Sequence, residues 1–349
     1  TRVPDCRRHP FSDHIDAIAP IRKLRTALWR YRRRRAASRH FSEHVAPLKP
    51  KVVLVNSWTA GTATWLQECR RRQLRFALVS HGLDLVRDLP GFDRRSRAGD
   101  FKAAALHIAN SSYTRDLLIQ RCPSTADRTV VLNPSVTMGP TPLDATAAAT
   151  ALDELGLQEK RFILGLGRLI KRKGFDLLID AFTQVQSRYP DLFLVIAGDG
   201  PEAANLQRVD NAANNVLLPG AVSEVQKHAL LQACDFFAMP NRRLTSDVEG
   251  FGIVFLEANL RGKAVIGGNN GGVPDAVIDG ETGLLVDTSD INELVQALED
   301  LLAAPERMHT LGDAGRRRAA EQFTIDQRTE EFTALAQRLC SPSVGSQRE

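Results

Sequence analysis

Short apolar runs alternate with amphipathic segments along the chain from residue 51 onward. Residues 52–55 and 76–79 are continuous apolar runs, which is typical of strands buried on both faces. Residues 62–72 lie between these runs and predict a helix. A strand, a helix and a strand in this order predict a parallel sheet.

The same rhythm continues at residues 106–109 and 129–132, with a helix between them that begins at Ser111 or Ser112. Polar residues follow the carboxyl ends of the first three strands, the edge where open α/β sheets collect ligands. They are residues 56–58, 80–82 and 110–112. Because His81 stands between a strand and a glycine, we favour a ligand contact over the structural role that a lone histidine more often has.

Residues 133–142 break this rhythm with three prolines and one glycine, and an Ala/Thr-rich stretch follows at 145–151. We therefore predict a boundary between a domain of residues 1–140 and a second domain that begins at 141. A second α/β series then follows. Its expected strands are 162–166, 192–197, 216–220, 235–240 and 264–268, and its expected helices are 175–188 and 223–233.

Composition agrees with a soluble α/β protein that has two cores, since 43% of the 349 residues are apolar and 25% are charged. The five cysteines are far apart and include no C-x-x-C pair, which argues against a disulfide framework and against a thiolate zinc site. No apolar run approaches the length that spans a membrane. We expect a cytoplasmic protein, and because the chain does not begin with Met, we expect it to be a fragment.

Residues 20–40 carry a dense group of cations on a helical apolar spacing that includes Ile21, Leu24, Leu28 and Tyr31. The cations are Arg22, Lys23, Arg25, Arg30, Arg32, Arg33, Arg34, Arg35 and Arg39. Such a basic amphipathic helix is either a solvated face over a core, or a surface for anionic lipid on the inner face of the plasma membrane, or a nucleic-acid contact. No nucleic-acid-binding motif follows it, so we do not expect a nucleic-acid partner.

Two cations follow the first strand of the second series. Arg168 and Lys173 lie in one loop after Gly167, and a diphosphate fits such a pair because Arg offers bidentate hydrogen bonds and Lys a point charge. An ordinary charged turn between a strand and a helix is the alternative.

Two acids flank a glycine-rich turn at residues 247–258. If residues 253–260 are helical, Glu249 lies in the loop before the helix and Glu257 lies two turns into it. The glycines allow positive φ and a close ligand, and the free N–H groups that follow form the positive end of a helix, which suits a phosphate. The residues concerned are Gly250, Phe251, Gly252, Ile253 and Val254. A buried helix with an acid in its entry loop is the alternative. A P-loop and a dinucleotide-binding G-x-G-x-x-G are both absent from the sequence.

These elements together resemble the family 4 glycosyltransferases of the GT-B architecture. The resemblance rests on Gly167-Arg168-Leu169, Lys173-Gly174, residues 197–201, the E-x7-E element, Gly271-Gly272-Val273-Pro274 and residues 280–283, in that order. It implies two Rossmann-like parallel-sheet domains that face each other across a cleft. It also implies transfer of a hexose from a nucleotide diphosphate sugar with retained configuration and without a metal or another cofactor.

Roles for single residues come from this resemblance alone. Arg168 and Lys173 are expected to hold the diphosphate, and Glu257 the ribose hydroxyls. Glu249 and the backbone of residues 250–254 are expected to orient the donor, and His81 to contact the transferred sugar. Residues 247–254 are similar to those of bacterial mannosyltransferases that act on phosphatidylinositol, so we expect GDP-mannose, with UDP-glucose as the alternative donor. A lipid-linked or saccharide acceptor in envelope or exopolysaccharide synthesis is expected.

The front of the chain departs from the family pattern. Residues 1–50 show no first strand and glycine-rich loop, so we expect an incomplete amino-terminal domain. At the other end, the resemblance makes residues 324–349 a helix that crosses back to the first domain, with a polar tail, and ends the second domain at 323. A catalytically inactive nucleotide-sugar-binding module and a membrane-surface protein remain as alternatives. The acceptor, the linkage, the base and the oligomeric state do not follow from the sequence.

Overall fold

The computed structural model describes residues 31–32, 34–59, 61–86, 91–137, 143–210 and 215–341. They belong to two units, one on each side of the boundary between Pro50 and Lys51, and each unit is described by itself. In the first unit, residues 31–32 and 34–40 are helical. They are followed by a π-helical turn, Phe41–Val45, and a 3-10 turn, Ala46–Leu48. Most of the predicted basic helix, and most of the segment expected to lack the family's first strand and loop, lies outside the described residues.

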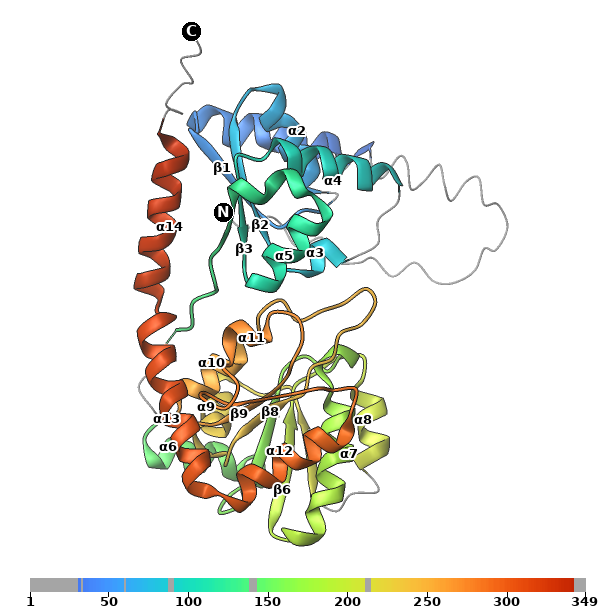
Figure 1. The fold of residues 1–349 in the computed structure, drawn as a ribbon, viewed down its shortest axis with the longest axis vertical. Helices are drawn as coiled ribbons and strands as arrows, with labels where there is room; N and C mark the ends of the chain where they lie inside the picture. The colour runs from blue at the N-terminus through green and yellow to red at the C-terminus, as the bar shows by residue number, and fades with distance from the viewer. Residues whose placement is uncertain are drawn as a thin grey trace, which may run out of the picture. The chain divides into compact units, whose positions relative to one another are not determined.

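The second unit contains two parallel sheets, as predicted (Figure 1). The first sheet has the order β1-β2-β3-β4, and every neighbouring pair is parallel. Its strands are β1 (Val52–Asn56), β2 (Arg75–Ser80), β3 (Leu106–Ala109) and β4 (Thr129–Val131). The connecting helices are α2 (Thr62–Arg71), α3 (Leu83–Val86), α4 (Gly91–Ala103), α5 (Ser112–Arg121) and the 3-10 turn η3 (Pro123–Arg128).

The second sheet has the order β10-β9-β8-β5-β6-β7 and is also parallel. Its strands are β5 (Arg161–Leu166), β6 (Leu192–Ala197), β7 (Val216–Gly220), β8 (Phe237–Met239), β9 (Val265–Gly268) and β10 (Leu284–Val286). The chain proceeds from β5 to β6 and β7 on one side, then returns to β8 on the other. Ligands of open α/β sheets bind beyond the carboxyl ends of the strands at such a switch point.

The second sheet is accompanied by several helices and 3-10 turns. They are α6 (Ala145–Asp153), η4 (Lys171–Lys173), α7 (Phe175–Val185), η5 (Gln186–Arg188), α8 (Ala203–Asp210), α9 (Glu224–Ala233), α10 (Ile253–Leu260), α11 (Val273–Ala276), α12 (Ile291–Ala303), α13 (Pro305–Gln322) and α14 (Ile325–Cys340). The Ala/Thr-rich stretch beside the predicted boundary is thus the helix α6, which begins at its N-cap Asp144. The predicted domain boundaries themselves stay a prediction.

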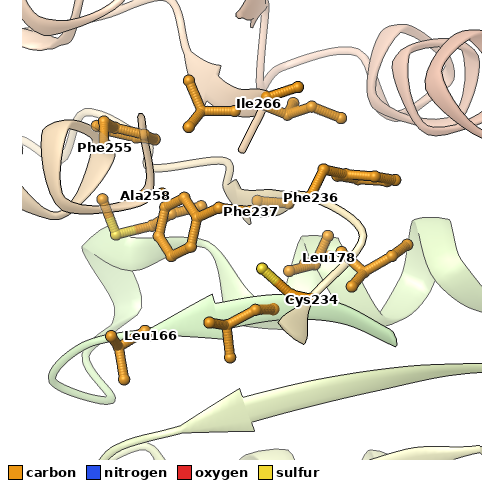
Figure 2. Packing of buried hydrophobic residues seen from close by; sticks show 14 of the residues in the cluster. Leu166, Leu178, Cys234, Phe236, Phe237, Phe255, Ala258 and Ile266 are labelled. Atoms are coloured by element: carbon orange, nitrogen blue, oxygen red, sulfur yellow. The ribbon is translucent and has the colours of Figure 1, made fainter. Parts of the chain in front are cut away.

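An aromatic core fixes α10 on the second sheet (Figure 2). The rings of Phe237 on β8 and Phe255 on α10 meet edge to face with centroids 5.6 Å apart, and both side chains are fully buried. Burial of each such side chain stabilises the fold by about 1.5–3 kcal/mol. Because α10 cannot shift without breaking this contact, the loop that precedes it has a fixed end.

The last helix, α14, reaches the first sheet. It contacts β1, and the guanidinium of Arg75 at the start of β2 donates a 2.9 Å hydrogen bond to the carbonyl oxygen of Ser341. Just before α14, the carbonyl of Phe323 accepts a 2.8 Å hydrogen bond from the backbone N–H of Val136. These contacts join the end of the chain to the region that follows β4.

Candidate functional site

A pocket of about 750 Å³ lies at the carboxyl ends of strands from both sheets. Its walls come from the loops after β2, β3, β4, β5, β6, β7 and β8, from α9 and from the first turns of α10. All of the predicted site residues line it: His81, Arg168, Lys173, Glu249, Gly250, Phe251, Gly252, Ile253, Val254 and Glu257. The roles assigned to them remain predictions, but the structure brings them together.

The cationic loop after β5 has a shape that requires glycine. Lys173 ends the 3-10 turn η4, and Gly174 follows in the left-handed region with φ of 73°. A Cβ at Gly174 would overlap the carbonyl oxygen of Pro240 in the loop after β8. The two loops can therefore approach closely only because this position carries no side chain, and this contact places Lys173 beside the acidic loop.

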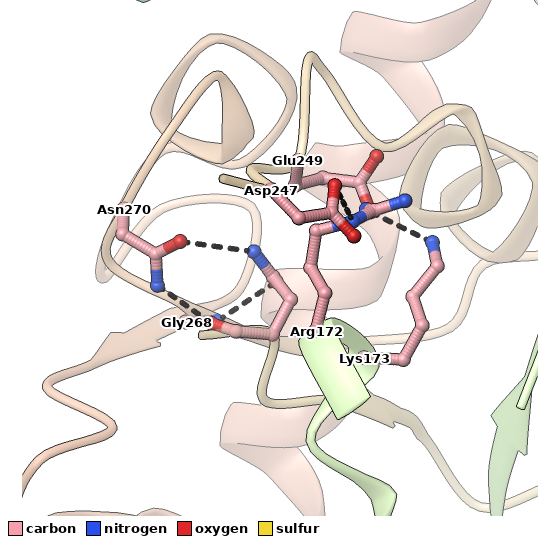
Figure 3. A network of polar contacts seen from close by, with 7 residues as sticks. Arg172, Lys173, Asp247, Glu249, Gly268 and Asn270 are labelled. Carbon is pink, nitrogen blue, oxygen red and sulfur yellow. Dashed lines mark hydrogen bonds and ion pairs between the residues drawn. The ribbon is translucent and has the colours of Figure 1, made fainter. Parts of the chain in front are cut away.

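The acidic loop meets the cations in a network of four charges (Figure 3). One oxygen of Glu249, Oε2, accepts from the guanidinium of Arg172 and, at 2.7 Å, from the ammonium of Lys173. Nε of Arg172 lies 3.0 Å from Oδ1 of Asp247. Because Glu249 is only 9% exposed, the pairing offsets the cost of removing its charge from water.

The loop after β8 is also tied to the loop after β9 (Figure 3). The side chain of Asn270 donates to the carbonyl oxygen of Asn241 at 2.6 Å, and Oδ1 of Asn241 accepts from the N–H of Gly268 at 3.3 Å. The segment that leads to Glu249 is thus held near its start by polar contacts and at its end by the helix α10.

The prediction of a helix over residues 253–260 is confirmed by α10. Gly252 precedes the helix with φ of 94°, as expected of a glycine that supplies positive φ. Gly250, for which positive φ was also possible, is not among the residues with positive φ. A Cβ at Gly250 would instead overlap the carbonyl oxygen of His81, so this glycine allows loops of the two sheets to touch.

Glu257 faces a cation from α9. The ammonium of Lys227 lies 2.8 Å from Oε1 of Glu257 and 3.6 Å from a carboxylate oxygen of Glu224. Burial acts to lower the pKa of Lys227, but the hydrogen bonds and charges of both acids outweigh burial and raise this pKa. Lys227 therefore stays charged at neutral pH and holds Glu257 at the pocket wall.

His81 is held by neighbours on the first sheet. Its Nε2 lies 2.6 Å from Oδ1 of Asn56 at the end of β1, and its backbone N–H donates to Oδ1 of Asp84 at 2.9 Å. Burial raises the pKa of Asp84, although the hydrogen bond from the backbone N–H of His81 acts in the opposite direction. With Nε2 bound to an amide oxygen, Nδ1 is the ring atom that remains for a ligand.

The pocket also contains two residues that the sequence did not single out. Arg172 and Lys227 line it and bind the two predicted acids. Asn110, which is one of the polar residues expected at the ligand-binding edge of the first sheet, also lines the pocket, from the end of β3. Arg172 is the direct neighbour of Lys173, which was a signal for its role. Lys227 lies in a helix far along the chain from Glu257, and nothing in the sequence pairs the two.

The part of the chain that the structure describes has neither a metal cluster nor a membrane-spanning helix. Within it, no group of three or more His, Cys, Asp or Glu side chains is arranged to hold a metal ion. No helix within it has the length and apolar character needed to cross a bilayer. The expectations of a metal-free reaction and of a cytoplasmic location stay predictions.

Two family models match the chain. The model described as "Glycosyl transferases group 1" matches residues 150–318, and the model described as "Glycosyltransferase Family 4" matches residues 3–138. The first match contains the cationic loop and both acids of the pocket, whereas the second contains His81 and Asn110.

Curated relatives match about half of the chain. A GDP-mannose-dependent alpha-(1-6)-phosphatidylinositol monomannoside mannosyltransferase of Mycolicibacterium smegmatis is 38% identical over 185 residues, which is 52% of this chain and 48% of the relative. A GDP-mannose-dependent mannosyltransferase of Corynebacterium glutamicum, named for the monoacylated form of the same lipid, is 39% identical over 49% of this chain and 45% of its own length. The chain thus spans about half the length of the curated relatives it matches.

Solved structures share the fold over most of the chain. The crystal structure of Anabaena HepE in complex with UDP aligns with a TM-score of 0.72 and covers 82% of this chain and 79% of HepE. The identity in this alignment is 20%, so the likeness is one of fold alone.

Proposed function

The chain belongs to the glycosyltransferases, with a GT-B fold of two Rossmann-like parallel sheets, and from this premise we propose that its pocket binds a nucleotide diphosphate sugar. We further propose that it transfers a hexose to a lipid-linked or saccharide acceptor with retained configuration. One observation carries the proposal. Two cations, two acids and a histidine, predicted from distant parts of the sequence, line a single pocket.

The diphosphate is assigned to the loop after β5 and the start of α10. Arg168 and Lys173 line this part of the pocket, and the first turn of α10 adds its positive end. In the structure, Lys173 pairs with Glu249. An incoming diphosphate offers Lys173 a stronger partner, while Arg172 keeps its own contact with Glu249.

The ribose is assigned to Glu257. This carboxylate lines the pocket two turns into α10, and its bond to Lys227 fixes its direction. A carboxylate accepts hydrogen bonds from two adjacent hydroxyls, which suits the 2′ and 3′ positions of a ribose. The pocket continues to Ala221 and Val222 after β7, where we place the base.

The transferred sugar is assigned to the region between Glu249 and His81. In the reaction, the bond between C1 of the sugar and the phosphate oxygen breaks, and the acceptor oxygen bonds to C1. The acceptor proton passes to the leaving phosphate oxygen. Negative charge builds up on the diphosphate as this bond breaks, and Arg168 and Lys173 stabilise that charge in the transition state.

GDP-mannose is the proposed donor, and a mannosylated phosphatidylinositol is the proposed acceptor. Both are supported by the names of the two mannosyltransferases that match this chain. UDP-glucose is the alternative donor, because the HepE fold also accommodates UDP.

Titration of the protein with GDP, UDP and ADP, and with their mannose and glucose conjugates, tests this function. A ligand that binds only the folded state raises the unfolding temperature by mass action. We expect GDP and GDP-mannose to raise it, and Glu257→Ala to weaken both effects. If no nucleotide binds, the pocket has another function. If the protein binds the donor but does not transfer the sugar, no GDP is released from GDP-mannose in the presence of acceptor.

A peripheral contact with an anionic membrane surface through residues 20–40 is part of the same proposal. Support comes from Arg32, Arg35 and Arg39, which are exposed on the described end of this segment. Each cation near an anionic surface contributes about 1 kcal/mol at low salt. Sedimentation with vesicles that contain phosphatidylinositol should therefore fall as salt rises, and salt-independent sedimentation would exclude this electrostatic contact.

A further inference from the structure

Asn110 is a buried polar residue at the wall of the pocket without a partner for its carbonyl oxygen. It follows β3 directly and is 7% exposed. Among the described residues, none hydrogen-bonds to its side-chain Oδ1. An unsatisfied buried acceptor destabilises the folded chain, so such a group at the wall of a binding pocket points to a partner that the ligand supplies.

The backbone of Asn110 is fixed on both sides. Its N–H donates to the carbonyl oxygen of Ser80 at 3.1 Å, and its own carbonyl oxygen accepts from the side chain of Asn133 at 3.1 Å. The same amide of Asn133 lies 3.2 Å from Oδ2 of Asp275, which also accepts from the N–H of Ser112 at 2.7 Å. Asn110 is therefore positioned before any ligand arrives.

The carboxamide of Asn110 lies in the part of the pocket assigned to the sugar. A Cβ at Gly250 would come within 2.8 Å of its Nδ2 and would overlap the carbonyl oxygen of His81. Asn110 is thus beside the contact between His81 and the loop that carries Glu249. Glu257, to which the ribose is assigned, belongs to α10, and Lys227, which fixes the direction of Glu257, belongs to α9.

We propose that the carboxamide of Asn110 hydrogen-bonds to a hydroxyl of the transferred sugar and so favours the sugar nucleotide over the free nucleotide. This inference rests on the proposed function. A carboxamide has a donor and an acceptor, and a hydroxyl can pair with either. A site built to bind a hydroxyl discriminates strongly against ligands that lack one, because the buried polar group is then left without a partner.

The test compares GDP with GDP-mannose by calorimetric titration of the wild type, Asn110→Ala and Asn110→Ser. We expect Asn110→Ala to weaken GDP-mannose about tenfold and to leave GDP within about twofold, since one hydrogen bond to the sugar is lost. Asn110→Ser keeps a hydroxyl that can donate and accept, and we expect it to recover part of the loss. If Asn110→Ala binds GDP and GDP-mannose with the affinities of the wild type, the inference is overturned. An equal loss of affinity for the two ligands would also overturn it.

Asn259 supplies a matched control. It is also buried and its Oδ1 also lacks a partner among the described residues, but it does not line the pocket. Asn259→Ala should lower the unfolding temperature without changing the ratio of the two affinities. If the wild type binds none of GDP, GDP-mannose, UDP and UDP-glucose, the proposed function fails. If the wild type binds GDP and GDP-mannose, and Asn110→Ala leaves the ratio of the two affinities unchanged, only this inference is overturned.

Discussion

The two sheets contribute different chemistry to the pocket. The second sheet supplies the ionic groups, namely Arg168, Arg172, Lys173, Lys227, Asp199, Glu249 and Glu257. The first sheet supplies His81 and Asn110, which offer hydrogen bonds without a fixed charge, together with Leu83. A diphosphate needs fixed positive charge, whereas a sugar needs directional hydrogen bonds. This difference supports the proposed placement of the nucleotide at the second sheet and of the sugar at the contact between both sheets.

Removal of one cation from the second sheet should have the largest effect on nucleotide binding. We expect Lys173→Ala to weaken GDP about 100-fold in a calorimetric titration, since a charge-assisted hydrogen bond in a half-buried site is lost. Lys171→Ala is the matched control, because Lys171 belongs to the same 3-10 turn but is exposed and does not line the pocket. Equal losses in the two variants would remove the diphosphate from this loop.

The contact between the sheets can be broken separately. In Gly250→Ala, the added methyl would overlap the carbonyl oxygen of His81 and push the two loops apart. We expect mannose transfer from GDP-mannose to phosphatidylinositol monomannoside to fall about 50-fold, while GDP binding changes little. Gly280→Ala is the control, since nothing lies near its added Cβ although its φ is 70°. Parallel loss of GDP binding in Gly250→Ala would show that the two functions are not separable.

Arg172 should act on turnover more than on binding. Its guanidinium bonds to Glu249 and lies beside Asp247, so Arg172→Gln removes the partner that keeps Glu249 in place once Lys173 turns to the diphosphate. We expect kcat to fall about tenfold with a smaller change in KM. A raised KM with unchanged kcat would instead make Arg172 a nucleotide ligand.

The titration of a buried histidine on the first sheet, His107, should have the smallest of these effects. It should change only the free energy of unfolding. Burial lowers the pKa of His107, with a further contribution from Arg128, although the hydrogen bond to the carbonyl oxygen of Phe101 acts in the opposite direction. The unfolded state therefore binds the proton more readily, and this contribution to stability is complete above about pH 6.5 and is lost as pH falls below it. Chemical denaturation from pH 7.5 to 5.0 should show a shallower decline in the free energy of unfolding for His107→Gln than for the wild type. Parallel curves would contradict this assignment.

Much of the fold could be predicted because its signals are local. Residues 106–109, 192–197 and 216–220 were expected as strands from their apolar runs alone, and the structure has strands with these bounds. Ser111 and Ser223 could be predicted as helix starts because serine is favoured at the N-cap. In the structure, each side chain accepts a hydrogen bond from a backbone N–H in the first turn. The helix α12 was missed, although its buried Leu294, Leu298 and Leu301 lie at helical spacing.

The site was predictable only where a motif carried it. Arg168, Lys173, Glu249 and Glu257 belong to short patterns with fixed spacing, and all of them line the pocket. Asn110 was expected only as one of the polar residues at a strand end, and its unpaired oxygen is visible only in the folded chain. The sequence indicated only that Gly250 can adopt positive φ, whereas its requirement for glycine arises from contact with His81, which is distant in sequence.

A crystal structure of this protein with GDP-mannose would show directly whether the pocket binds the donor with its diphosphate on the two cations. We expect the diphosphate within hydrogen-bond distance of Arg168 and Lys173. We expect the ribose hydroxyls on Glu257, and the mannose between Glu249, His81 and Asn110. A nucleotide bound outside this pocket, or inside it with the diphosphate away from both cations, would contradict the assignment of the pocket to the nucleotide sugar.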